Sequence, residues 1–254
     1  MTVLFSDIRS YTTIAEEFTA EENFIFLSAY LEKMTEIVTA HHGMVNQLLG
    51  DGILAFFNRS DDALLASIEM QDLLQNYQVD RAQGEPIRIK AGIGLHSGEV
   101  IIGIMGNAQT MDTGIVSDTV NAAARIEGLT KHFGVNILLS DTVAEQLPPN
   151  MRDQLRFIGR VKVKGKKRYI SLYECFDGDD VEMKTKKAAY LQAYHQALDL
   201  YCTQHFRQAA SQFAQLALHN NADSLLHYYE SKSNSLINKV IPDDWNAIDS
   251  SDIK

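Results

Sequence analysis

The stretch Met44-Val45-Asn46-Gln47-Leu48-Leu49-Gly50-Asp51-Gly52-Ile53-Leu54-Ala55-Phe56-Phe57 does most to decide the fold. It contains two short apolar runs, residues 44–49 and 53–57, separated by a Gly-Asp-Gly turn. Glycines beside an aspartate between two apolar runs are typical of a β-hairpin. We therefore expect two antiparallel strands here, with the carboxylate of Asp51 projecting from the hairpin end.

Short strands and amphipathic helices alternate on both sides of this hairpin. Upstream, residues 3–5 predict a strand, and apolar spacing from Ala20 onward predicts a long helix that ends with Gly43 in the left-handed position. Downstream we expect a helix over 61–77, a hairpin of strands 87–95 and 99–105, a loop holding Gly106 and Gly114, a helix over 118–133, a strand over 135–139, a short helix over 140–147 and a last hairpin with arms 157–163 and 169–175. Helices interleaved with mostly antiparallel hairpins indicate an α+β fold.

The composition becomes purely helical from about Met183. Aromatic and apolar residues recur at helical spacing over 190–216, and a third helix is predicted over 223–237. Such stacked helices resemble a tetratricopeptide-type unit, which needs a neighbour to pack against. We expect a main domain over 1–178, a helical extension over 183–241 and an acidic tail over 242–254 that is loose or weakly docked.

Composition narrows the class of protein. The 254 residues include 23 Lys and Arg against 33 Asp and Glu, a net charge of −10 that argues against nucleic-acid binding. Only two cysteines are present, which suits a reduced, cytoplasmic setting. No apolar run approaches the roughly 20 residues that span a bilayer. Because the first predicted strand begins almost at Met1, we expect a longer protein, in contact with a membrane only through N-terminal segments absent here.

Two acidic residues lie at special places in this arrangement. Asp7 directly follows the first predicted strand, and Asp51 occupies the hairpin tip. Where the two strands lie side by side, both carboxylates converge on one edge of the sheet. Paired carboxylates bind hard cations such as Mg²⁺, which keeps substrate phosphates among its ligands. Aspartate also favours turns for structural reasons, and for either residue alone that role is the commoner one.

Two further places could handle phosphates. Asn121 and Arg125 are four residues apart at the start of the helix predicted over 118–133, so they share one helical face. Arginine can hold phosphate oxygens in a fork, although a solvated face with Arg125 paired to a carboxylate is the commoner reason for such spacing. Lys164 lies in the basic turn Lys-Gly-Lys-Lys, which could reach a terminal phosphate or simply protect a strand edge.

Five motifs occur in order along the chain. They are Phe-Ser-Asp-Ile-Arg-Ser-Tyr-Thr (5–12), Leu-Gly-Asp-Gly-Ile-Leu-Ala-Phe-Phe (49–57), Leu-His-Ser-Gly-Glu-Val (95–100), Ser-Asp-Thr-Val-Asn-Ala-Ala-Ala-Arg-Ile-Glu (117–127) and Val-Lys-Gly-Lys (163–166). With this order and spacing, residues 1–176 resemble the class III nucleotide cyclase catalytic domain. The C-terminal part also resembles the helical extension of bacterial adenylate cyclases that carry upstream sensory domains.

The resemblance implies a ferredoxin-like α+β core that works as a head-to-tail homodimer on ATP. It also implies that Asp7 and Asp51 hold two divalent ions, Mg²⁺ or Mn²⁺, with help from the backbone carbonyl of Ile8. One ion would activate the ribose 3′-hydroxyl for attack on the α-phosphorus, and the other would clamp the β- and γ-phosphates.

The opposite protomer would complete each active site. By resemblance, Asn121 orients the ribose, Arg125 stabilises charge that grows on the α-phosphoryl group, and Lys164 meets the leaving pyrophosphate. The implied function is adenylate cyclase activity, which yields cyclic AMP and pyrophosphate without a protein nucleophile.

The sequence departs from the family pattern at the two positions that recognise the purine base. Adenine-selective members usually have Lys four residues before the second metal-binding Asp, where this chain has Gln47. Seven residues before Asn121 they usually have Asp or Thr, whereas this chain has Gly114 with Thr113 beside it. A glutamine amide can pair with either purine, and the guanylate-selective Glu and Cys are missing too, so ATP is favoured. Ser10 replaces a usual Gly and should alter the first turn slightly.

Two alternatives stay open from the sequence. One is a guanylate cyclase or a cyclase of relaxed base choice. The other is a catalytically inactive cyclase-like module that binds only nucleotide or a partner. The retained pair Asp7 and Asp51 argues against the second, because two adjacent carboxylates are costly to keep without a function.

Overall fold

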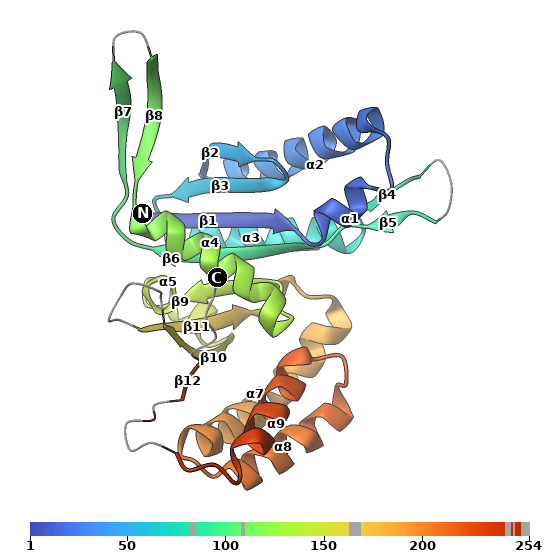
Figure 1. Ribbon diagram of the computed structural model, residues 1–254, viewed down its shortest axis with the longest axis vertical. Coiled ribbons are helices and arrows are strands. Elements are labelled where there is room, and N and C mark those ends of the chain that lie inside the picture. Colours follow the sequence, from blue (N-terminus) through green and yellow to red (C-terminus); the bar gives the residue numbers. More distant parts are fainter. Residues whose placement is uncertain (82–84, 108–109, 163–168, 242–244, 246, 250–254) are drawn as a thin grey trace.

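The computed structural model describes the chain except for residues 82–84, 108–109, 163–168, 242–244, 246 and 250–254. Among the described residues, eight strands form one sheet in the order β12-β10-β11-β9-β6-β1-β3-β2 (Figure 1). These strands are β1 (Thr2–Ile8), β2 (Met44–Leu49), β3 (Gly52–Phe57), β6 (Ala91–Ser97), β9 (Ile137–Ser140), β10 (Leu155–Lys162), β11 (Tyr169–Cys175) and β12 (Ile248–Asp249). The expected α+β fold is confirmed.

The predicted hairpin is present as β2 and β3, and it packs beside β1. Strands β1 and β3 are antiparallel, with Ser6 opposite Ile53. Strand β1 is longer than predicted: pairing with β6 continues to Ile8, opposite Ala91. Asp7 is therefore the penultimate residue of the strand and does not follow it, contrary to the sequence prediction.

Helices cover both faces of the sheet (Figure 1). Helices α2 (Ala20–Ala40) and α3 (Ser60–Gln75) pack on one face, where apolar side chains of β1, β3 and β6 form the main core. Helix α4 (Asp118–Phe133) packs on the other face. Thr19 and Glu22 close a capping box at the start of α2, and Ser117 caps α4 by accepting from Thr119 N–H. Capping thus fixes where both helices begin.

The remaining elements are short. They are α1 (Tyr11–Ala15), β4 (Gln78–Val79), β5 (Ile87–Arg88), α5 (Asp141–Ala144), α6 (Pro149–Arg152) and the 3₁₀ helix η1 (Phe176–Gly178). The helix predicted over 140–147 is thus shorter than expected. Helix α2 ends as predicted near Gly43, but His42 takes the left-handed conformation, with φ of 62°. A Cβ on Gly43 would come within 2.5 Å of the Phe57 ring, so packing explains this glycine.

The prediction that residues 87–95 pair with 99–105 is wrong. Strand β7 (Ile101–Asn107) pairs with β8 (Thr110–Val116) in a separate two-stranded sheet that projects from the domain (Figure 1). Strand β6 already has β1 on one edge and β9 on the other, so neither edge is left for β7. Gly106 and Gly114, which we expected in a loop, lie in this projecting arm.

The C-terminal helices pack on the part of the sheet formed by β9, β10 and β11. They are α7 (Val181–Cys202), α8 (Phe206–His219) and α9 (Ser224–Leu236), and they share one apolar core with α4. The tail is more firmly docked than predicted where it is described, because Trp245 packs edge-on against Tyr201 and Phe206, and β12 pairs with β10. None of the described helices is both long and apolar enough to span a bilayer.

A buried ionic cluster joins these helices to the sheet. The Arg156 side chain on β10 has no exposed area and donates to Glu174 on β11 and to Asp223, which caps α9. Lys187 on α7 donates to Glu174 and to Asp179, each at 2.6 Å. Although burial alone lowers the pKa of Arg156, its two carboxylate partners raise it well above the usual range. The cluster therefore holds charge at the junction of α7, α9, β10 and β11.

Candidate active site

Asp7 and Asp51 lie together, as the sequence predicted. Asp7 is on β1, Asp51 is in the turn between β2 and β3, and the pairing of β1 with β3 brings them to one edge. The Ile8 N–H donates to Asp51 Oδ2 at 3.3 Å, and the two carboxyl groups hydrogen-bond to each other. A Cβ on Gly52 would lie 3.3 Å from Asp7 Oδ1, so the glycine leaves room for that carboxylate.

The surroundings of Asp7 favour its protonated form when no cation is present. Burial raises the pKa of Asp7 to about 7, and the charge of Asp51 adds to this effect. When both carboxyl groups ionise, they place two negative charges close together. Such a concentration of negative charge attracts a divalent cation.

A third carboxylate, that of Glu127 on α4, lies close to this pair. It rests against Gly92, which is the partner of Asp7 on the neighbouring strand β6. Its pKa is raised, first by burial, while the nearby Arg9 guanidinium opposes the rise. Arg9 donates from Nη2 to the Val135 carbonyl at 2.6 Å and is partly buried. No role for Glu127 or Arg9 was predicted from the sequence. The signal was available in the alternation Ala-Gly-Ile-Gly-Leu over 91–95, because glycines two apart on one face of a strand let a helix approach closely.

Helix α4 places Asn121 at the other end of β1 from Asp7. Gly98, next to the end of β6, faces Thr119 at the start of α4, whereas Gly92 faces Glu127 further along the helix. Thr2 lies opposite Ser97 and Asp7 opposite Gly92, so the start of α4 lies over the Thr2 end of β1. Asn121 precedes Glu127 by six residues, which is about 9 Å along the helix axis. Within one chain, Asn121 is thus well separated from the carboxylate pair, and it is exposed.

The other predicted site residues are spread over separate elements. Gln47 is exposed on the edge strand β2, next to a bulge, and pairs with Leu54. Thr113 and Gly114 lie on β8 of the projecting arm. Arg125 is half-buried on α4, one turn after Asn121. Lys164 lies outside the described residues.

The residues present fit a divalent cation that shares its coordination with a substrate. Asp7 and Asp51 offer carboxylate oxygens, the ligand type that Mg²⁺ and Mn²⁺ prefer. Within the part of the chain that the structure describes, no three His, Cys, Asp or Glu side chains come together as a metal site. The donor set is therefore the pair, a number typical of cations that also bind phosphates.

The sequence of residues 1–175 matches the family model of the adenylate and guanylate cyclase catalytic domain. The chain belongs to this family. The match covers the sheet from β1 to the end of β11, including every element that carries a predicted site residue. The family generally uses divalent metal ions, which agrees with the carboxylate pair of this cyclase domain.

Named relatives support the assignment. The cyclase domain is 41% identical over 182 residues to an adenylate cyclase of Anabaena cylindrica, covering 68% of this chain and 36% of the relative. The structure of a bacterial light-regulated adenylyl cyclase superimposes with a TM-score of 0.61 at 26% identity, covering 75% of this chain and 56% of that one. The guanylyl cyclase Cya2 superimposes with a TM-score of 0.56 at 29% identity, covering 68% of this chain and 89% of that one. This chain therefore spans about a third of the length of the Anabaena relative.

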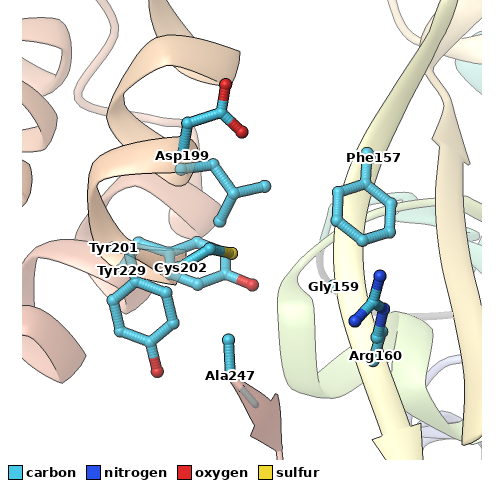
Figure 2. A pocket seen from close by; sticks show the side chains of 9 residues that line it. Phe157, Gly159, Arg160, Asp199, Tyr201, Cys202, Tyr229 and Ala247 are labelled. Carbon is cyan, nitrogen blue, oxygen red and sulfur yellow. The ribbon is translucent and has the colours of Figure 1, made fainter. Parts of the chain in front are cut away.

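A cavity of about 330 Å³ lies away from the carboxylate pair (Figure 2). It opens between β10 and helices α7 and α9, with Phe157 and Arg160 on the strand side and Asp199 and Tyr229 on the helix side. None of the predicted site residues lines it. The cavity belongs to the junction with the C-terminal helices and adds nothing to the candidate active site.

Proposed function

We propose that this chain is an adenylate cyclase that converts ATP to 3′,5′-cyclic AMP and pyrophosphate. In this reaction the ribose 3′-oxygen bonds to the α-phosphorus, the bond from that phosphorus to the α,β-bridging oxygen breaks, and the hydroxyl proton passes to solvent. The observation that carries the proposal is the pairing of Asp7 with Asp51 at the edge of β1 and β3 in a cyclase-family domain.

Asp7 and Asp51 would hold two divalent ions, Mg²⁺ or Mn²⁺, with the backbone carbonyl of Ile8 as a further ligand. When bound, such ions lower the pKa of the 3′-hydroxyl and neutralise the triphosphate. The protein contributes a pair of carboxylates fixed on adjacent elements, so the cations need little reorganisation to bind.

The active site would be completed by a second copy of the chain. Asn121 would orient the ribose, Arg125 would stabilise charge on the α-phosphoryl group, and Lys164 would bind the leaving pyrophosphate, all from the partner. Two observations support a homodimer. Asn121, near the start of α4, lies toward the Thr2 end of β1 and away from Asp7 within one chain. The edge strand β2 also exposes apolar side chains, namely Met44, Leu48 and Leu49.

The purine would be read by Gln47 on β2 and by Thr113 or Gly114 on β8. Gln47 is exposed, so its amide is accessible to a ligand, and an amide can both donate to a ring nitrogen and accept from an exocyclic amine. ATP is favoured because the Anabaena relative at 41% identity is named an adenylate cyclase. We also propose that residues 1–178 form the catalytic domain, and that the chain acts in the cytoplasm, where its nucleotide substrate is found.

Product analysis tests the proposal directly. Purified protein, shown to be dimeric by light scattering, is given ATP or GTP with Mn²⁺, and cyclic products are separated and quantified. We expect cyclic AMP from ATP, and the ratio of the two products measures base choice. A dimeric protein that makes neither cyclic nucleotide would refute the proposal. If cyclic GMP predominates, the preferred substrate is GTP and not ATP.

Two substitutions assign the roles. Asp51→Ala should abolish turnover while the fold is retained, because the cation pair loses a ligand. Arg125→Ala should lower kcat far more than it raises KM, because its guanidinium acts mainly on the transition state. Asp153→Ala, at an exposed aspartate beyond α6, is the matched control and should leave both constants unchanged.

A further inference from the structure

Helix α4 approaches β6 unusually closely because β6 has glycine at two positions on the facing side. A Cβ on Gly94 would collide with the backbone nitrogen of Glu127 and with the carbonyl of Ala123. A Cβ on Gly92 would collide with Glu127 Oε1 and Thr130 Oγ1. The two glycines therefore form a notch that receives the start of the Glu127 side chain and its carboxylate.

The notch places Glu127 beside the cation-binding pair. Gly92 is the register partner of Asp7 on the neighbouring strand, so a carboxylate resting on Gly92 lies next to Asp7. Asp7 points to the α4 face of the sheet, because it alternates with Ile8, which is buried in the core on the opposite face. The charges of Glu127 and Asp7 interact, and so do those of Glu127 and Asp51.

Glu127 is held in place but is not itself part of the ligand set. The described residues contain no group of three carboxylates close enough to bind one metal ion. Arg9 supplies a partly buried positive charge that interacts with Glu127 and is anchored to the Val135 carbonyl. Three carboxylates and one guanidinium leave a net negative charge at this edge of the sheet, which attracts divalent cations.

We propose that Glu127 is a positioning residue for the active site: its carboxylate, seated on Gly92 behind Asp7, strengthens the binding of divalent cations by Asp7 and Asp51 without coordinating them. This inference rests on the proposed function, because it needs a cation at that pair. It also gives α4 two tasks, since the same helix carries Asn121 and Arg125.

Calorimetric titration of Mn²⁺ into the nucleotide-free dimer tests the proposal. Glu127→Gln removes the charge but keeps the size of the side chain. We expect the Kd for Mn²⁺ to rise about tenfold, because one nearby negative charge is lost, and the thermal midpoint of the metal-free protein to stay the same or rise. Glu127→Asp, which restores the charge, should recover most of the affinity. Glu36→Gln, at an exposed position on α2, is the matched control and should bind Mn²⁺ as the wild type does.

The outcomes separate this inference from the proposed function. If the wild type binds no Mn²⁺, or binds it equally well with Asp51→Asn, the metal site itself is wrong. If Asp51→Asn abolishes binding while Glu127→Gln binds with wild-type affinity, the metal site stands and the role of Glu127 is refuted. A lower thermal midpoint with unchanged Mn²⁺ affinity would show that Glu127 only supports packing, and that result also overturns the proposal.

Discussion

Replacing Asp7 by Asn should stabilise the metal-free protein while removing its response to divalent cations. The carboxyl group of Asp7 is half-buried beside Asp51, and these surroundings raise its pKa from 3.8 to about 7. An asparagine is nearly the same size and carries no charge. Its amide can also donate a hydrogen bond to Asp51, as the protonated carboxyl does. The substitution therefore removes a charge repulsion without creating a cavity.

The size and pH dependence of the effect follow from the pKa of Asp7. The folded protein keeps a proton that the unfolded chain loses above about pH 4, so the stability contributed by protonated Asp7 is lost as the pH rises through about 7. At about 1.4 kcal/mol per tenfold change in the equilibrium constant, the upper limit is about 4 kcal/mol. Solvent screens a half-buried group, which reduces the expected gain to about 1–2 kcal/mol above pH 7. This corresponds to a rise in Tm of about 3–6 °C.

Thermal unfolding of both proteins, measured from pH 4 to pH 8.5 with a chelator present, gives the comparison. The difference in Tm should start near zero at about pH 4 and reach its full size above about pH 7. Added Mn²⁺ should then raise the Tm of the wild type and leave Asp7→Asn unchanged, since binding to the folded state alone stabilises it. Asp153→Asn, an exposed control, should show no such pH-dependent difference. A constant offset across the pH range, or a less stable variant at pH 8, would refute the reasoning.

Three other substitutions test the packing around the site and its support. Arg156→Ala should destabilise the protein by about 3–5 kcal/mol in urea unfolding, because it leaves buried carboxylates without their main cation, and a loss below about 1 kcal/mol would contradict the charged cluster. Ser10→Gly should raise the free energy of unfolding by about 0.5–1 kcal/mol, since Ser10 has a left-handed φ of 57° that glycine adopts freely, and a lower Tm would disprove this strain. Gly94→Ala should lower the free energy of unfolding by about 1–3 kcal/mol and reduce activity, because the added methyl group pushes α4 away from β6. Gly103→Ala is the control and should be tolerated, because the space around Gly103 is open. Equal effects at both positions would argue against the notch.

Sequence patterns predicted the elements whose signals are local. The hairpin over 44–57 was visible from its Gly-Asp-Gly turn, and the helix predicted over 118–133 has the bounds of α4. The three C-terminal helices were predicted by their apolar spacing. The convergence of Asp7 and Asp51 was also predicted, because it needed only the assumption that two early strands are neighbours.

Other features depended on contacts between distant parts of the chain. Sequence spacing favoured a hairpin of residues 87–95 with 99–105, but β6 is occupied on both edges, so β7 pairs with β8. No sequence pattern singled out Arg156 or Lys187, yet both are buried because α7 and α9 close over the sheet. Glu127 gained its place beside Asp7 only through the fit of α4 against two glycines of β6.

The sequence by itself determined the chemistry that the chain can offer, namely paired carboxylates, an amide and a guanidinium at family spacing, because residue type and local hydrogen bonding are properties of short segments. The tertiary structure decided which of these groups meet. Strand pairing and helix packing join residues that are far apart along the chain. The sequence of a short segment does not show which distant segment it will contact. The charge of Glu127 behind Asp7, and the separation of Asn121 from the carboxylate pair, therefore appear only in the folded molecule.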